Sequence, residues 1–172
     1  MEKNVVDKIY SDFTQLIDFL ECNEEISMKN EADNNFKKVL VLTIASYFET
    51  KITSLLIDFV GRKTNLNGQI ISLVRNKISG REYHKLFNWE HKNANSFFQL
   101  FGEDFQSSVE QDVEKDGALN ESICAFLRIG NDRNKMVHEN FGVFMIDETA
   151  KEVYELYEKA NCFMSYLSKK LD

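Results

Sequence analysis

The sequence predicts an all-α fold, and three observations lead to this class. The 172 residues include no proline and only seven glycines, so few residues interrupt a helix. Apolar residues make up 43% and charged residues 28% of the chain, as in an ordinary folded protein. Apolar side chains also recur at intervals of three and four along much of the chain. A chain of this length buries one sizeable core, so we expect a single helical domain over residues 1–172.

The spacing of apolar residues predicts the first helices in order. Residues 4–22 place their apolar side chains on one face of a helix. Residues 36–60 are apolar on most sides and predict a central helix that ends at Gly61 and the basic pair after it. Between residues 67 and 105 the patterns shorten, which predicts two or three brief helices joined by polar turns.

Two further helices are predicted in the C-terminal third. Asn120 offers an N-cap for a helix that ends at His138. After a short irregular or extended link, Asp147 offers an N-cap for a last helix with a strong apolar face.

Several features narrow the functional classes. Acidic residues interrupt the N-terminal apolar residues at once, and no apolar run reaches about 18 residues, so we expect a cytoplasmic protein with no membrane partner. Cys22, Cys124 and Cys162 lie far apart within apolar patterns, which predicts reduced core thiols. The chain contains no glycine-rich phosphate loop, GxSxG, HExxH or CxxC motif. We expect no metal and no cofactor.

The charge is uneven along the chain. A net charge of −7 argues against general affinity for nucleic acid, which relies on concentrated Lys and Arg. Residues 61–92, however, carry seven bases against two acids. Two interpretations stay open, a solvated helical face and a surface that follows phosphates.

The stretch "RNKMVH" places Arg133 five positions before His138 near the end of an apolar helix. Five positions turn an ideal helix through about 500°, so the two side chains lie about 140° apart around its axis. Arginine donates bidentate hydrogen bonds to phosphate, and histidine transfers protons near neutral pH. Together they suffice for metal-free RNA cleavage. One chain offers one well-placed histidine, whereas a two-fold dimer would supply two copies of each residue.

The element "FLRIGNDRNKMVHENF" resembles the Arg-x4–6-His signature of the HEPN (higher eukaryotes and prokaryotes nucleotide-binding) superfamily. The polar residue directly after the arginine, here Asn134, is part of this resemblance. The apolar segment "VLVLTIASYFETKI" resembles an earlier helix of those domains, which often carries an acid that faces the motif, here Glu49. The resemblance implies a HEPN-like bundle with two long antiparallel helices plus shorter helices.

The resemblance also implies a homodimer formed through the motif helices and, frequently, metal-independent ribonuclease activity in toxin–antitoxin, abortive-infection or CRISPR-linked defence systems. Our first hypothesis is therefore a metal-independent endoribonuclease with an RNA substrate and a composite site at the dimer interface. Because a free ribonuclease would harm its host, we expect an antitoxin or sensor protein to control it. The alternative is a non-catalytic dimerisation or interaction module, since some members have lost catalysis.

Each candidate site residue has a predicted role and an alternative. His138 would transfer protons, Arg133 would hold the scissile phosphate and Asn134 would orient the site, while Arg133 and His138 could instead be ordinary C-terminal helix cations. Glu49 would hold a cation or histidine in place, or pair with Lys51 or Lys38, or be solvated. Two further cations are candidates for contacts with RNA, although the first of the two could instead only flank the motif helix without binding RNA. They are Arg128 and Lys135.

A second group of aromatic and basic residues lies in "REYHKLFNWEH". Its rings and cations could stack bases and hold phosphates. The preferred interpretation is that the aromatic residues pack in the core and that His84 and His91 are exposed at the surface.

Overall fold

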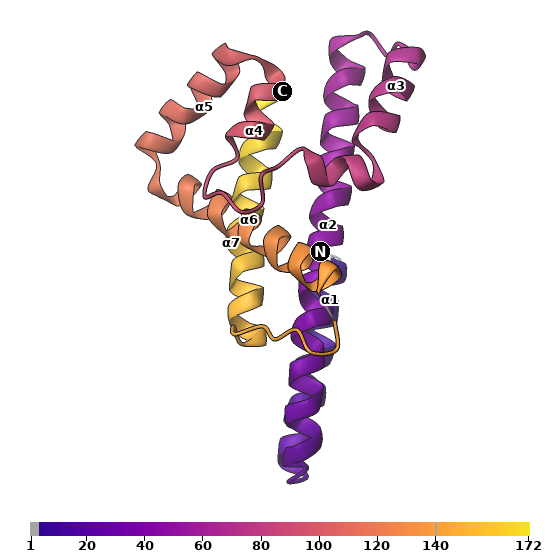
Figure 1. Cartoon of the computed structure of the whole chain (residues 1–172), viewed down its shortest axis with the longest axis vertical. Helices are drawn as coiled ribbons and strands as arrows, with labels where there is room; N and C mark the ends of the chain where they lie inside the picture. The colour runs from indigo at the N-terminus through magenta and orange to yellow at the C-terminus, as the bar shows by residue number, and fades with distance from the viewer. Residues whose placement is uncertain (1–3, 140) are drawn as a thin grey trace.

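The computed structural model describes residues 4–139 and 141–172, with every side chain except that of Arg81. Within these ranges the chain forms helices joined by turns and links, and no strand. Figure 1 shows a long helical hairpin on one side, the last helix running alongside it, and the helix before the last lying across both. The predicted all-α class is confirmed.

The N-terminal hairpin consists of α1 (Val5–Cys22) and α2 (Ile26–Lys63), which run antiparallel along the N-terminal half of α2 (Figure 1). The Asn4 side chain caps α1 by accepting hydrogen bonds from two backbone N–H groups. The first helix was predicted over residues 4–22, and it begins one residue later because Asn4 is its N-cap. The central helix, in contrast, is longer than the predicted residues 36–60 because packing against α1 stabilises its more polar N-terminal turns. It also continues through Gly61, which is buried.

Four short helices follow in the middle of the chain, where two or three were predicted. They are α3 (Gly68–Ile78), the 3-10 helix η1 (Gly80–Lys85), α4 (Asn95–Phe98) and the 3-10 helix η2 (Gln99–Phe101). Helix α5 (Glu103–Lys115) was not predicted. Its composition is strongly acidic and its only buried side chain is that of Val109, so its apolar pattern is weak.

The last two helices are α6 (Gly117–His138) and α7 (Ala150–Lys170), and both begin at a different residue from the predicted one. Asp116, and not Asn120, caps α6, because its side chain accepts hydrogen bonds from the N–H groups of residues 118 and 119. Thr149, and not Asp147, caps α7, where it forms a reciprocal capping box with Glu152. In both cases several residues that can cap a helix lie close together in the sequence, so the sequence alone does not determine which of them is the N-cap.

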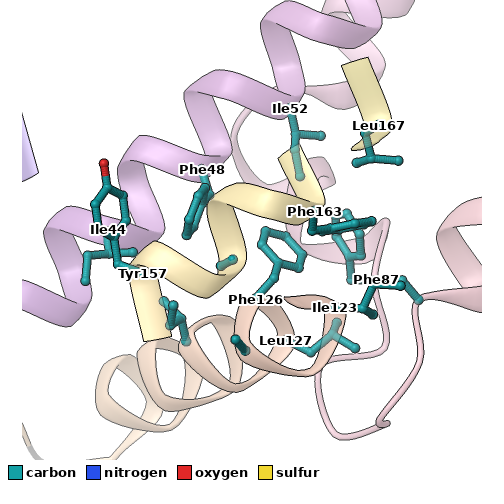
Figure 2. Close-up of a cluster of buried hydrophobic side chains, with 14 of the residues drawn as sticks. Ile44, Phe48, Ile52, Phe87, Ile123, Phe126, Leu127, Tyr157, Phe163 and Leu167 are labelled. Atoms are coloured by element: carbon teal, nitrogen blue, oxygen red, sulfur yellow. The ribbon is translucent and has the colours of Figure 1, made fainter. Parts of the chain in front are cut away.

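The core lies where α2, α6 and α7 meet. Figure 2 shows Phe48 from α2, Phe126 from α6 and Phe163 from α7 pointing toward one another. The ring centroid of Phe126 lies 5.6 Å from that of Phe48, 5.3 Å from that of Phe163 and 5.0 Å from that of Phe87. These separations suit attractive ring contacts. The core therefore fixes the motif helix α6 against α2 and holds the segment after η1 against α6.

Helix α2 also contains a stretch long and apolar enough to cross a membrane. In this structure α2 packs against α1, α6 and α7, as the central helix of a folded domain does. The three cysteines are free but do not lie in the core, so that prediction is wrong. Cys22 and Cys162 are exposed, and Cys124 is half-buried, with its thiol 3.2 Å from the backbone oxygen of Lys92.

Phe126→Ala should lower the free energy of unfolding by about 3–5 kcal/mol, because it removes a fully buried ring from the centre of the core. Urea denaturation measures this change. Leu100→Ala is the control, since Leu100 is exposed and its truncation should change stability by less than about 0.5 kcal/mol. Equal losses in the two variants would contradict the position of Phe126 in the core.

Candidate functional site

The predicted motif occupies the last two turns of α6. Arg133 and Asn134 are half-buried, and His138 is exposed as the final residue of the helix. Nη1 of Arg133 donates a hydrogen bond of 3.1 Å to Oδ1 of Asn134. The asparagine thus holds the guanidinium from one side, and its role in orienting a site stays a prediction.

Glu49 lies on α2 where that helix faces the motif. Burial raises the pKa of the Glu49 carboxyl, while the nearby positive charge of Arg133 lowers it. The two alternative partners point elsewhere: Nζ of Lys38 donates to the backbone oxygen of Phe141 at 2.8 Å, and Nζ of Lys51 lies over the ring of Tyr47. The structure therefore brings Glu49 and Arg133 together within one chain.

His84 of η1 is a third member of this group, and the sequence analysis did not assign it to the site. Its side chain is only 24% exposed, so the prediction of surface exposure is wrong for His84. Nε2 of His84 lies 3.9 Å from Oε2 of Glu49. Burial and the charges of Arg133 and His138 lower the pKa of the imidazole. The ring is therefore neutral at neutral pH, and its approach to Glu49 is not an ion pair.

The second histidine of this segment, His91, is exposed, as predicted. Three aromatic residues of the segment pack inward, also as predicted. They are Tyr83, Phe87 and Trp89. Burial raises the pKa of the Tyr83 hydroxyl, and Glu49 raises it further, so this tyrosine stays neutral.

Trp89 fixes η1 over α6. Its ring packs on Phe126, with centroids 5.6 Å apart, and Nε1 donates a hydrogen bond of 2.8 Å to the backbone oxygen of His84. A Cβ atom placed on Gly130 would lie 2.0 Å from two carbons of this indole. Gly130 is therefore needed for the close approach. A glycine within the apolar face of a predicted helix is the signal in the sequence that could have indicated this contact.

An open cleft of about 590 Å³ lies between the η1 segment and the end of α6. Residues that line it include Lys85, Trp89, Glu90, Asn134, Lys135, His138 and Glu139. His84 and Arg133 border a narrow crevice beside it, and Trp89 lines both hollows. The cleft combines an aromatic ring, an imidazole and two lysines, a set of groups that can stack a base and bind phosphate.

The predicted RNA-contacting residues lie in different settings. Lys135 is exposed and lines the cleft beside His138. Arg128 lies outside the cleft, where Nε donates to Oδ2 of Asp132 at 2.8 Å and the guanidinium also pairs with Glu148. Two carboxylates thus compensate its charge, and a contact between Arg128 and RNA stays a prediction.

The basic segment 61–92 does not form one continuous surface at the site. Arg62 and Lys63 donate to the C-terminal backbone oxygens of residues 171 and 172. Lys85 lines the cleft and pairs with Glu82. Among these three cations only Lys85 borders the candidate site, and contact between this segment and phosphate stays a prediction.

The chain matches the family model described as RiboL-PSP-HEPN over residues 7–172. No curated protein and no solved structure showed significant similarity to the chain.

Arg128→Ala should destabilise the protein by about 1–2 kcal/mol, because it leaves the largely buried carboxylate of Asp132 without its partner. This loss of stability is small for an ion pair because the Arg128 side chain is half exposed, so that solvent screens its charge. Lys135→Ala, on the same helix but exposed, should change stability by less than about 0.5 kcal/mol. Thermal or urea unfolding measures both. An Arg128→Ala variant as stable as Lys135→Ala would show that the ion pair contributes nothing.

Proposed function

The chain belongs to the RiboL-PSP-HEPN family, and on this basis we propose that it is a metal-independent endoribonuclease of a defence or toxin–antitoxin type system. The HEPN family consists of RNase-like or nucleotide-binding modules. The observation that carries the more specific proposal is a cleft lined by Asn134, His138, an aromatic ring and lysines, with Arg133 in the adjoining crevice and hydrogen-bonded to Asn134.

The chemistry follows from the groups present. Cleavage requires removal of the proton from the ribose 2′-hydroxyl, protonation of the departing 5′ oxygen and stabilisation of the charge on the phosphoryl group. Arg133 stays charged at every relevant pH and binds the phosphoryl oxygens, with its guanidinium oriented by Asn134. His138 is exposed at the cleft and transfers a proton. Glu49, beside Arg133, balances its charge in the absence of substrate.

The proposal includes an assembly and a setting. Two copies of α6 would face each other across a two-fold axis, so that the composite site contains the motif of each chain. The enzyme would act in the cytoplasm without a membrane partner, under the control of an antitoxin or sensor protein that restrains it until infection or stress.

One observation favours a second function, that of a non-catalytic dimerisation or interaction module. Apolar side chains are exposed at and just beyond the end of α6, next to the motif. They are Val137, Phe141, Val143 and Met145. Exposed apolar groups that gather in this way are typical of a protein interface. A protein that cleaves no RNA but loses association when this cluster is made polar would fit this module.

Purified wild-type protein should cleave single-stranded RNA in the presence of EDTA and leave DNA of the same sequence intact, because the 2′-hydroxyl is the nucleophile. His138→Ala should lower the cleavage rate by about 10²–10⁴-fold, the usual contribution of a general acid or base. His91→Ala is the matched control, since His91 is exposed outside the cleft lining. Gel analysis of labelled products with 5′-hydroxyl ends measures the rates.

Three results would count against the enzyme. They are wild-type protein that cleaves no RNA, activity that EDTA abolishes, and cleavage that survives unchanged in His138→Ala.

A further inference from the structure

His84 has no role in the mechanism given above, although it lies within the same group of side chains. It belongs to η1, a segment far in sequence from the motif, and Trp89 holds its backbone in place with a 2.8 Å hydrogen bond. Nδ1 is shielded from solvent and has no hydrogen-bond partner among the described residues. Nε2 is 3.9 Å from Oε2 of Glu49, beyond hydrogen-bond distance. Neither ring nitrogen is therefore committed to a hydrogen bond among the described residues, and because Nδ1 is shielded, Nε2 is the nitrogen open to a substrate.

The charged surroundings of His84 come from two helices. On α6, the positive charges of Arg133 and His138 reach it and, after burial, are the next causes of its lowered pKa. On α2, the carboxylate of Glu49 lies on the Nε2 side of the ring. Tyr83, the neighbour within η1, is buried and neutral. An imidazole in this setting carries a free lone pair at neutral pH, and Glu49 stabilises the cation that forms when the ring accepts a proton.

We propose that His84 is the second proton-transfer residue of the ribonuclease site, so that one chain carries both histidines that the reaction needs. The inference rests on the proposed ribonuclease function and deepens it. His84 accepts the proton of the 2′-hydroxyl, and His138 donates a proton to the departing 5′ oxygen. The dimer then shapes the substrate cleft and need not supply a missing imidazole.

Both proton transfers belong to one transesterification step. The 2′ oxygen forms a bond to phosphorus while the bond from phosphorus to the 5′ oxygen breaks. The 2′ proton passes to Nε2 of His84, and the proton held by His138 passes to the 5′ oxygen. The products are a 2′,3′-cyclic phosphate and a 5′-hydroxyl end. The two imidazoles have exchanged protonation states, and solvent restores both without an oxidant, reductant or metal.

The test is the pH dependence of single-turnover cleavage of a fluorescent mixed-sequence RNA oligonucleotide in EDTA. Wild-type enzyme should lose activity as the pH falls and His84 becomes protonated, because only the neutral ring accepts the proton. His84→Gln should lower the rate by at least about 100-fold and abolish this acidic limb of the profile. The matched control His91→Gln should leave both the rate and the profile within about twofold of wild type.

Glu49→Gln provides a second variant with a different signature. Loss of the carboxylate removes the group that stabilises protonated His84, so the acidic limb should move to lower pH while circular dichroism shows a folded protein. If His84 only supported the fold, Glu49→Gln could lower the cleavage rate but would not move the acidic limb of the pH profile.

The outcomes separate cleanly. A His84→Gln enzyme with the wild-type rate, or one with a lower rate but an unchanged acidic limb, overturns the role of His84 and leaves the ribonuclease proposal standing. A wild-type protein without activity on any RNA overturns the ribonuclease proposal, and the role of His84 falls with it.

Discussion

The lack of a side chain at Gly130 allows the indole of Trp89 to lie directly on the backbone of α6. A Cβ atom at this position would meet two ring carbons at 2.0 Å, so any larger residue must displace the indole. The indole also holds the backbone of His84 and packs on Phe126. One small residue on the motif helix thus determines where η1 lies, and through η1 it places His84 next to Arg133 and Glu49.

Much of the fold could be predicted from periodic apolar spacing, because buried faces of long helices leave a regular pattern. Helix α1 was predicted to within one residue of its observed bounds, and α6 with its observed end, for this reason. Helix α5 was missed because it buries one side chain, that of Val109. The starts of α6 and α7 were misplaced because several residues near each start can cap a helix, and only tertiary packing decides which one does.

The candidate site could be predicted in part. Arg133, Asn134 and His138 share one short motif, and the acid at Glu49 followed from a resemblance in a second segment. His84 left no comparable signal, since it lies in a 3-10 turn without periodicity and reaches the site only through the contact of Trp89 with α6. From the sequence, only a two-fold assembly could supply a second histidine, whereas in the folded chain His84 lies near enough to feel the charges of Arg133 and His138. His84 was missed because it is far from the motif in the sequence, although it lies close to the motif in the folded chain.

The central claim is that Arg133, His138 and His84 share one site within a single chain, and an NMR pH titration of the His84 ring tests it most directly. In wild-type protein the pKa of His84 should lie below its ordinary value of about 6.5. In Arg133→Gln the loss of a neighbouring positive charge should raise it, whereas the control Arg75→Gln, on the exposed face of α3, should leave it unchanged. A His84 that titrates at its ordinary value in wild type, or that does not respond to Arg133→Gln, would contradict the account.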